Sequence, residues 1–148
     1  GVNFRGKGML FVGRSGAGKS TMANMLKGIA EILCDDRIII RRWPDGFKIH
    51  GTWNHGEVPD ISNNPVHLEA ILFLRKVREN KLMPLTDKKE IIKRLLSCLI
   101  RPFVTKDWWD KTLILIEKIS DNIPCYVLEF NKDGMVVDVL NEAMKSNK

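Results

Sequence analysis

The chain has 148 residues, of which 44% are hydrophobic and 28% charged, so its length and composition are those of one globular domain of ordinary size. Its 24 Lys and Arg against 18 Asp and Glu give a net charge of +6, but the basic residues form no stripe interleaved with aromatic residues, which argues against nucleic-acid binding. No apolar run approaches the roughly 20 residues that span a bilayer, and the first residues do not resemble a signal peptide, so no membrane partner is expected.

The cysteines of the chain are widely spaced and include no C-x-x-C pair. They are Cys34, Cys98 and Cys125. An odd number of cysteines without a pairing pattern indicates buried thiols in a reducing compartment. We therefore expect a cytoplasmic location.

The first half of the chain is expected to contain buried strands, one helix and a hairpin. Gly8 to Gly13 includes a continuous apolar run, which is typical of a strand buried on both faces. Lys19 to Lys27 has apolar residues at helical spacing, with Gly28 where a C-terminal cap belongs. The elements that follow are a short apolar run at Ile32 to Cys34, a strand at Arg37 to Trp43, a turn at Pro44 to Gly46 and a returning strand at Phe47 to Trp53.

The second half begins with a polar loop and continues with further strands and helices. Asn54 to Pro65 is predicted to be the loop, and His67 to Val77 a strand, with a helix as the competing interpretation. Thr86 to Leu99 is a well-marked amphipathic helix with Thr86 as its cap. The remaining elements are a helix at Asp107 to Ile119, a strand at Cys125 to Phe130 and a closing helix at Val136 to Met144.

This mixed order of strands and helices, with an early antiparallel hairpin, predicts an α/β fold. We expect a single domain over residues 1–148, built as a mixed β-sheet with flanking helices rather than as a simple doubly wound sheet. No repeat, low-complexity tract or linker divides the chain.

The residues from Gly13 to Ser20 match the phosphate-binding P-loop pattern G-x-x-x-x-G-K-[ST]. The loop directly follows an apolar strand and opens an amphipathic helix, whose positive end favours a bound phosphate, so a glycine-rich turn without a ligand is the weaker alternative. Gly13, Gly16 and Gly18 permit positive φ and close backbone approach, Lys19 can reach the β- and γ-phosphates, and Ser20 can ligate Mg²⁺. The predicted nucleotide-binding residues are Gly13, Ser15, Gly16, Ala17, Gly18, Lys19, Ser20 and Thr21.

An acidic metal partner is expected, because phosphoryl transfer depends on positioning and charge neutralisation. Asp35 and Asp36 are the best candidates, since they directly follow the apolar run that ends at Cys34. Adjacent residues on a regular strand point to opposite faces, so both can serve the site only where the strand breaks. One carboxylate would hold Mg²⁺ and the other would accept a proton from an attacking hydroxyl. A solvent-exposed pair beside Arg37 is the alternative.

Other acidic residues compete as metal ligands. Glu129 lies near the end of a predicted strand, whereas Glu117 follows a leucine and isoleucine stripe that indicates a core helix. Glu57 lies in the long polar loop, a kind of segment that is often functional, with His55 two residues before it. A lone loop histidine is more often simply solvated. The remaining histidines, His50 and His67, lie in strand-like contexts and are weaker candidates.

Several stretches of the chain together resemble the HPr kinase/phosphorylase superfamily, which is related in fold to the phosphoenolpyruvate carboxykinases. The P-loop and its helix to Gly28 are followed by Asp35-Asp36-Arg37, which is the distinguishing mark. Gly51 to Glu57 and the stretch from Phe73 to Leu85 are similar to relatives of this superfamily with no assigned substrate, some of which belong to peptide natural-product pathways. The resemblance is most specific over residues 8 to 37.

The resemblance implies ATP as the nucleotide and Asp36 as the general base, with Asp35 or Glu57 as a partner of Mg²⁺ beside Ser20. The HPr kinase signature expected downstream of the aspartates is absent, so HPr itself is not the expected acceptor. The superfamily also has an upstream strand region with a histidine near the site. Because this chain begins only 12 residues before the P-loop, we expect a version truncated at the N-terminus, or a minimal one.

The sequence therefore predicts an ATP- and Mg²⁺-dependent kinase that transfers a γ-phosphoryl group to a hydroxyl. A serine of a peptide or protein is the preferred acceptor, Asp36, Asp35 and Lys19 are the catalytic residues, and a homo-oligomer is compatible with this prediction. One alternative is a P-loop kinase of a nucleotide or small metabolite, which would need clustered lid arginines. Another is a nucleotide-binding regulatory module without turnover. Asn131-Lys132-Asp133 misses the guanine-reading N-K-x-D motif, because its aspartate comes one residue early.

Overall fold

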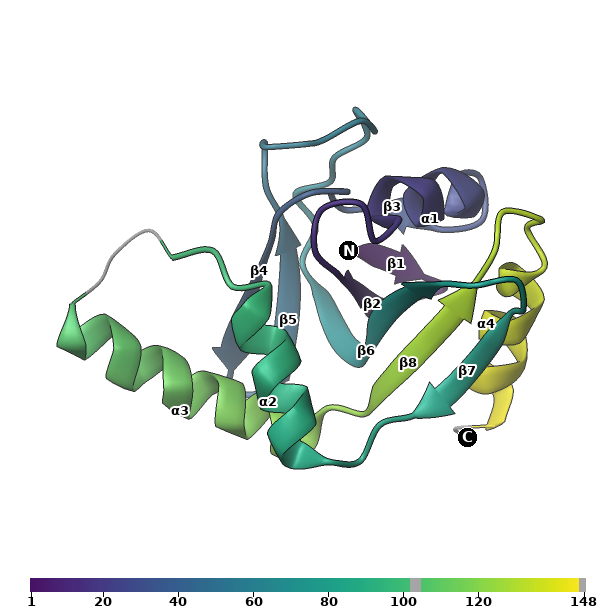
Figure 1. The fold of residues 1–148 in the computed structure, drawn as a ribbon. Helices are drawn as coiled ribbons and strands as arrows, with labels where there is room; N and C mark the ends of the chain where they lie inside the picture. The colour runs from purple at the N-terminus through teal and green to yellow at the C-terminus, as the bar shows by residue number, and fades with distance from the viewer. Residues whose placement is uncertain (102–104, 147–148) are drawn as a thin grey trace.

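The computed structural model describes residues 1–101 and 105–146, which form an α/β fold with a mixed β-sheet (Figure 1). The strands of this part are β1 (Val2–Phe4), β2 (Lys7–Val12), β3 (Glu31–Ile32), β4 (Ile38–Trp43), β5 (Gly46–Gly51), β6 (Val66–Lys76), β7 (Lys81–Pro84) and β8 (Cys125–Phe130). Its helices are α1 (Lys19–Leu26), α2 (Lys88–Ser97), α3 (Lys106–Asn122) and α4 (Val136–Ser146). None of these described helices is long and apolar enough to cross a membrane. The predicted α/β class with a mixed sheet is confirmed.

β6 is the strand around which the sheet is organised. It pairs with β2 and β8 in parallel and, through its first two residues, with β5 in an antiparallel arrangement. β1 and β3 extend the sheet beyond β2, β4 extends it beyond β5, and β7 pairs with β8. The register between β2 and β6 shifts after Gly8, which pairs with Leu68, because Met9 pairs with Ala70 and leaves Glu69 as a bulge.

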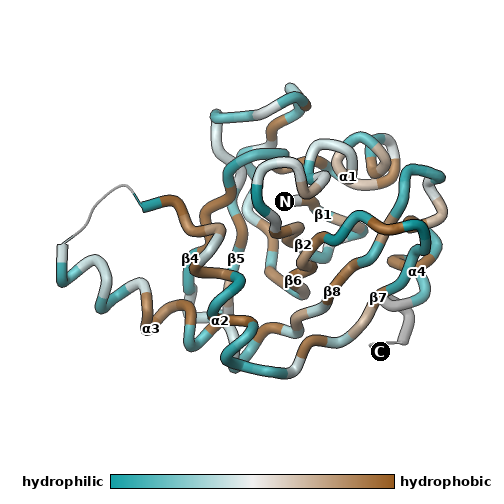
Figure 2. The backbone as a smooth tube through the Cα atoms, in the orientation of Figure 1, coloured by the Kyte–Doolittle hydropathy of each residue, from teal (hydrophilic) through white to brown (hydrophobic). Residues whose placement is uncertain are grey.

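Two apolar layers cover the two faces of the central strands. On one face, α1 and α4 pack over a cluster that includes Met9, Phe11 and Leu72. On the other face, α2 and α3 pack over Leu10 and Ile71. Successive side chains of a strand point to opposite faces, so β2 contributes to both layers and its sequence is a continuous apolar run. Figure 2 shows the hydrophobic residues concentrated on these central strands.

Most of the elements predicted from sequence are confirmed, with ends that differ by a few residues. The segment predicted as His67 to Val77 lies in strand β6 except for Val77, so the competing helix interpretation is wrong. The apolar run at Ile32 to Cys34 contributes only its first residue to β3, although the other two are buried. The sequence analysis missed β1 and β7, because strands of three and four residues are too short to show a periodicity.

The start of α2 corrects one prediction. Thr86 was the expected cap, but the side chain of Asp87 fills this role by accepting hydrogen bonds from Lys89 N at 3.0 Å and Glu90 N at 3.4 Å. Threonine and aspartate both cap helices, and here they are neighbours. The sequence pattern alone therefore does not choose between them.

The parallel pairing of β2, β6 and β8 brings the carboxyl ends of these strands to one edge of the sheet. The loop between β2 and α1 lies at this edge, next to the end of β8: a Cβ atom on Gly18 would lie 2.6 Å from Cζ of Phe130. Ligands of open α/β sheets bind beyond the carboxyl ends of the strands. The predicted P-loop thus occupies the part of the fold in which a ligand is expected.

We predict that Asp87→Ala lowers the free energy of unfolding by about 0.5–2 kcal/mol, because two backbone N–H groups of α2 lose their acceptor. Thr86→Ala is the matched control and should change it by less than about 0.5 kcal/mol. Urea denaturation of both variants beside the parent protein measures the difference. Equal losses in the two variants would contradict the assignment of the cap.

Candidate nucleotide-phosphate site

The P-loop joins β2 to α1 through a tight turn, in which Ala17 N donates to Arg14 O at 3.0 Å. Gly16 and Gly18 have φ angles of 81° and 104°, which residues with a side chain adopt only under strain. Gly13 has no positive φ, but its Cβ atom would lie 2.5 Å from Cβ of Ala17. Gly16 and Gly18 therefore provide the left-handed conformations that the loop requires, and Gly13 provides the close approach.

The interior of the loop offers backbone donors that no side chain occupies. Gly18, the N-cap of α1, contributes no capping side chain, and the first turn of the helix contains no acidic residue. A Cβ atom on Gly16 would meet no atom within 4 Å, so the space beside the loop is open there. The free N–H groups at a helix N-terminus carry partial positive charge and attract anions. N–H groups of this kind, at a glycine-rich loop and the first turn of a helix that includes Ser20 and Thr21, are the donors that bind phosphate in other proteins.

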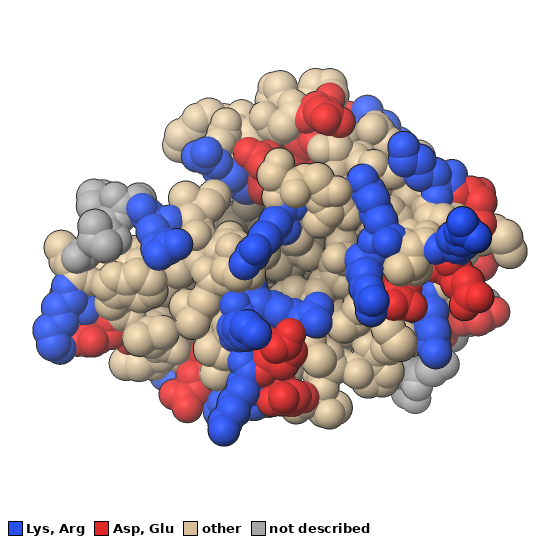
Figure 3. Space-filling model, viewed as in Figure 1, with Lys and Arg blue, Asp and Glu red and all other residues tan. Residues whose placement is uncertain are grey.

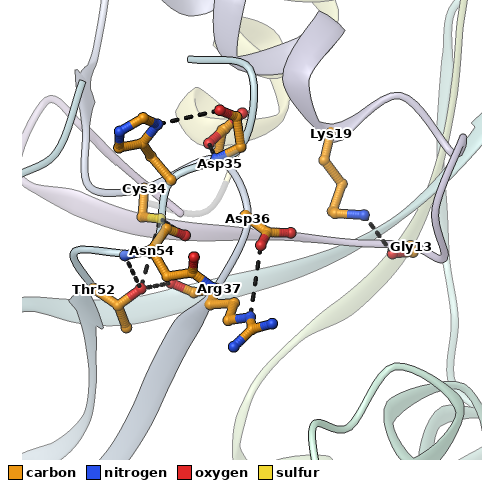
Figure 4. A network of polar contacts seen from close by, with 10 residues as sticks. Gly13, Lys19, Cys34, Asp35, Asp36, Arg37, Thr52 and Asn54 are labelled. Atoms are coloured by element: carbon orange, nitrogen blue, oxygen red, sulfur yellow. Dashed lines mark hydrogen bonds and ion pairs between the residues drawn. The ribbon is translucent and has the colours of Figure 1, made fainter. Parts of the chain in front are cut away.

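Lys19 lies folded over the loop. Its ammonium donates to the backbone oxygen of Gly13 at 2.9 Å (Figure 4). It also donates to the backbone oxygen of Arg14 at 3.3 Å. These acceptors are neutral carbonyls, whereas phosphate oxygens are charged and form stronger hydrogen bonds with an ammonium group. A phosphate in the loop would therefore compete effectively for Lys19.

A hydrogen bond connects the P-loop helix to the aspartate segment. Ser20 Oγ donates to Oδ2 of Asp35 at 3.0 Å, and Asp35 is only 6% exposed. Gly56 N donates to Oδ1 of the same carboxylate at 2.6 Å, and Val58 N donates to Oδ2 at 3.0 Å. Burial by itself would raise the pKa of Asp35, but the hydrogen bonds from Gly56, Val58 and Ser20 outweigh it and hold the pKa below its ordinary value. Asp35 is therefore a fixed, ionised carboxylate beside the P-loop serine.

Asp36 has a different environment from its neighbour. Its side chain is 44% exposed, and its Oδ2 lies 3.6 Å from Nε of Arg37 (Figure 4). With its amide oxygen turned toward this guanidinium, Asn54 accepts from Arg37 Nε at 2.7 Å and from Nη1 at 3.1 Å. Both aspartates follow the end of β3, so they lie where the strand breaks, as the sequence analysis required. The alternative of a solvent-exposed pair beside Arg37 describes Asp36 but not Asp35.

The long polar loop after β5 holds the aspartate segment in place. Thr52 Oγ1 donates to the backbone oxygen of Arg37 at 3.0 Å, and Cys34 Sγ donates to that of Asn54 at 3.5 Å (Figure 4). A side chain at Gly56 would press against this carboxylate, because a Cβ atom would lie 3.0 Å from Oδ2 of Asp35. The sequence analysis named Glu57 of this loop as a possible Mg²⁺ partner, whereas the described contacts of the loop with Asp35 come from its backbone.

None of the other acidic and histidine candidates forms a described hydrogen bond or ion pair with Asp35. Glu57 is exposed and, among the described residues, forms no hydrogen bond or ion pair. His55 is exposed, and its Nδ1 lies 3.2 Å from the backbone oxygen of Gly56. The remaining candidates have partners elsewhere: Glu129 with Arg75 at 3.1 Å, Glu117 with Lys88 at 3.4 Å, His50 with Trp43 at 3.4 Å and His67 with Asp45 at 3.3 Å.

The loops after β6 and β8 are tied together beside the P-loop. Asn80 donates to Oδ1 of Asp133 at 2.9 Å, and its own amide oxygen accepts from Asn131 N at 3.0 Å. The same Oδ1 of Asp133 accepts from Met135 N at 2.9 Å. These contacts give Asp133 a structural role and agree with the departure of this segment from the guanine-reading motif.

The sequence analysis missed the backbone donors of Gly56 and Val58. Such groups leave no signature, because every residue except proline carries an N–H group. The buried Val58 was the one available sign, since it is an apolar residue within a polar loop.

We find no protein-family model, curated protein or solved structure that matches this chain. The function is therefore inferred from the residues of the site and their geometry.

We predict that Asp35→Asn lowers the free energy of unfolding by about 1.5–3 kcal/mol at pH 7, because hydrogen bonds to a buried charged group are lost. The pKa of Asp35 is lowered by folding, so its stabilising effect is present above the unfolded pKa of about 3.9 and is lost as pH falls through the folded pKa. The difference in the free energy of unfolding between Asp35→Asn and the parent protein should therefore become smaller at acidic pH.

Urea denaturation of the parent, Asp35→Asn and Asp36→Asn proteins at a series of pH values between about 7 and 3 tests this prediction. Asp36→Asn is the matched control, because it removes the same charge from an exposed position. A difference for Asp35→Asn that stays constant down to the lowest pH would contradict the assigned role of the ionised carboxylate.

Proposed function

We propose that this protein is an ATP- and Mg²⁺-dependent kinase that transfers the γ-phosphoryl group of ATP to a hydroxyl. The observation that carries the proposal is the 3.0 Å hydrogen bond between Ser20 and the buried Asp35. This bond joins the P-loop and the Asp-Asp-Arg segment in one site. Each of these sequence features is weaker support for a kinase when taken alone. The resemblance of both segments to the HPr kinase/phosphorylase superfamily favours a serine of a peptide or protein as the acceptor.

The donor set at Ser20 and Asp35 fits Mg²⁺. This ion takes oxygen ligands, keeps several waters and usually needs only one or two carboxylates beside the substrate phosphates. The described residues contain no group of three or more His, Cys, Asp or Glu that could hold a metal ion, so the proposed site depends on the phosphates as well. Glu57, between the two residues whose N–H groups bind Asp35, remains the proposed second carboxylate. When bound, Mg²⁺ would neutralise charge on the phosphate oxygens.

The protein groups have separate tasks in the proposed reaction. The P-loop N–H groups bind the phosphate chain, and Lys19 exchanges its carbonyl acceptors for phosphate oxygens. Asp36 accepts the proton of the acceptor hydroxyl while the hydroxyl oxygen bonds to the γ-phosphorus and the bond from that phosphorus to the ADP oxygen breaks. The exposure of Asp36 leaves this carboxylate accessible to a large acceptor such as a protein segment. Arg37 orients the carboxylate through their ion pair.

A nucleotide-binding module without turnover is the second candidate. It is favoured by the contact between Asp36 and Arg37, because this ion pair occupies one carboxylate oxygen that a general base would turn toward its substrate. Nucleotide binding is common to both candidates. Phosphoryl transfer separates them.

We predict that Lys19→Ala weakens binding of Mg²⁺·ATP and Mg²⁺·ADP by about 10- to 100-fold, as expected for the loss of charge-assisted hydrogen bonds to phosphate. The fold should be retained, because the described contacts of the Lys19 ammonium are with its own loop. Isothermal titration calorimetry and a thermal melting curve measure the two effects. Lys27→Ala, at the other end of α1, removes the same charge and should bind like the parent. A folded Lys19→Ala protein with unchanged affinity would refute the P-loop assignment.

We predict that Asp36→Asn retains binding of Mg²⁺·ATP but lowers phosphoryl transfer by about 10²- to 10⁴-fold, the usual contribution of a positioned general base. Asp35→Asn should instead weaken the Mg²⁺ dependence of binding. Acceptors are sought by incubating the parent protein with γ-labelled ATP and lysate fractions and mapping the labelled sites, after which the variants are compared on that acceptor. If both variants transfer phosphate like the parent, the module without turnover is the better account.

A further inference from the structure

The end of β6 carries basic residues beside the P-loop. β6 continues past its last pair with β2, Phe73 with Val12, through Leu74, Arg75 and Lys76. Because β2 and β6 are parallel, these three residues run alongside the loop that follows β2. Asp35, which accepts the hydrogen bond from Ser20, lies in the segment after β3 and not on β6. The neighbouring parallel strand therefore brings positive charge to the loop.

Lys76 is in direct contact with the phosphate loop. A Cβ atom on Gly18 would lie 2.7 Å from Cε of Lys76, so the end of the lysine stem passes across the glycine that precedes Lys19. Phe130, which pairs with Lys76 across β6 and β8, lies against the same glycine. Gly18 thus has two structural reasons to lack a side chain, its φ of 104° and the ring of Phe130, whose Cζ would lie 2.6 Å from a Cβ atom.

The charge of Lys76 is not matched by a partner in the part of the chain that the structure describes. Its neighbour Arg75 pairs with Glu129 at 3.1 Å, whereas no described hydrogen bond or ion pair involves the Lys76 ammonium. Figure 3 shows Lys and Arg side chains bordering a hollow in the middle of the face that Figure 1 presents. The ammonium of Lys76 is therefore available to an anion bound in the P-loop.

We propose that Lys76 is a second phosphate-binding lysine, whose ammonium contacts an oxygen of the polyphosphate chain held by the P-loop. The inference rests on the proposed binding of ATP at this loop, but not on phosphoryl transfer. Lys19 and Lys76 reach the ligand from different elements, α1 and β6. The affinity of the site should therefore rise with the number of ligand phosphates, since a ligand with a longer charged chain can satisfy both lysines.

The test compares Lys76→Met, Lys76→Arg and Lys118→Met by calorimetric titration with Mg²⁺·ATP, Mg²⁺·ADP and AMP. Lys118 lies exposed on α3, on the opposite sheet face from α1, and Lys118→Met removes the same charge. We expect Lys76→Met to weaken Mg²⁺·ATP binding by about tenfold, with a smaller effect on AMP, and to make binding less sensitive to salt. Lys76→Arg should bind within about threefold of the parent, because it keeps the charge.

Lys19→Ala, measured in parallel, separates failure of this inference from failure of the proposed function. If Lys19→Ala loses nucleotide while Lys76→Met binds like Lys118→Met, the role of Lys76 is overturned and the P-loop assignment stands. If the parent protein binds no nucleotide, or Lys19→Ala binds like the parent, both are overturned. Circular dichroism of each variant confirms that the fold is retained.

A measurement on the parent protein makes the conclusion independent of the variants. Brief acetylation with and without Mg²⁺·ATP, followed by peptide mass spectrometry, should show nucleotide-dependent protection of Lys76 and of Lys19, but not of Lys118. Equal acetylation of Lys76 in both conditions, with Lys19 protected, would overturn the inference.

Discussion

A carboxylate removed from water must be matched by hydrogen-bond donors, and at Asp35 this requirement holds the candidate site together. Its donors come from α1 through Ser20 and from the loop after β5 through Gly56 and Val58. Three segments that are distant in the sequence therefore meet at one side chain. Loss of the carboxylate would leave the part-buried N–H group of Gly56 and the buried N–H group of Val58 without acceptors, which is why its loss would affect more than the affinity for a metal ion.

The fixed position of Asp35 also determines what its neighbour can do. Because Asp35 turns inward to its donors, Asp36 turns toward solvent and Arg37. One carboxylate thus has the rigidity expected of a metal partner, and the other has the access expected of a group that meets a second substrate. This difference in environment between adjacent aspartates supports the proposed transferase over the proposed binding module.

Charge around the P-loop is divided between its two sides. Asp35 approaches from the segment after β3, whereas Lys76 approaches from the end of β6. The free N–H groups of α1 and the ammonium of Lys19 lie with the loop itself. The proposed ligand, a phosphate chain with a divalent cation, carries both signs of charge, and charge complementarity provides orientation as well as affinity.

The sequence alone determined the local features of this protein. The apolar run of β2, the glycines of the P-loop and the stripe of α2 depend on neighbours within one element, so their spacing identifies them. The sequence did not decide whether Thr86 or Asp87 caps α2, because the side chains of both residues can accept hydrogen bonds from backbone N–H groups. Only the path of the chain selects Asp87. The same limit applied to β1 and β7, which exist through pairing with longer strands.

In the candidate site, too, the sequence predicted residues by local pattern, and the tertiary structure decided which of them meet. Sequence spacing predicted Lys19, Ser20 and the aspartate pair as site residues, because phosphate binding with a metal ion favours these residue types. Only the tertiary structure decided that Asp35, rather than Asp36 or Glu57, meets Ser20, and that Lys76 reaches Gly18. These contacts join residues that the chain separates widely. They depend on the parallel register of β2 and β6 and on backbone N–H groups, which every non-proline residue possesses and no sequence pattern distinguishes.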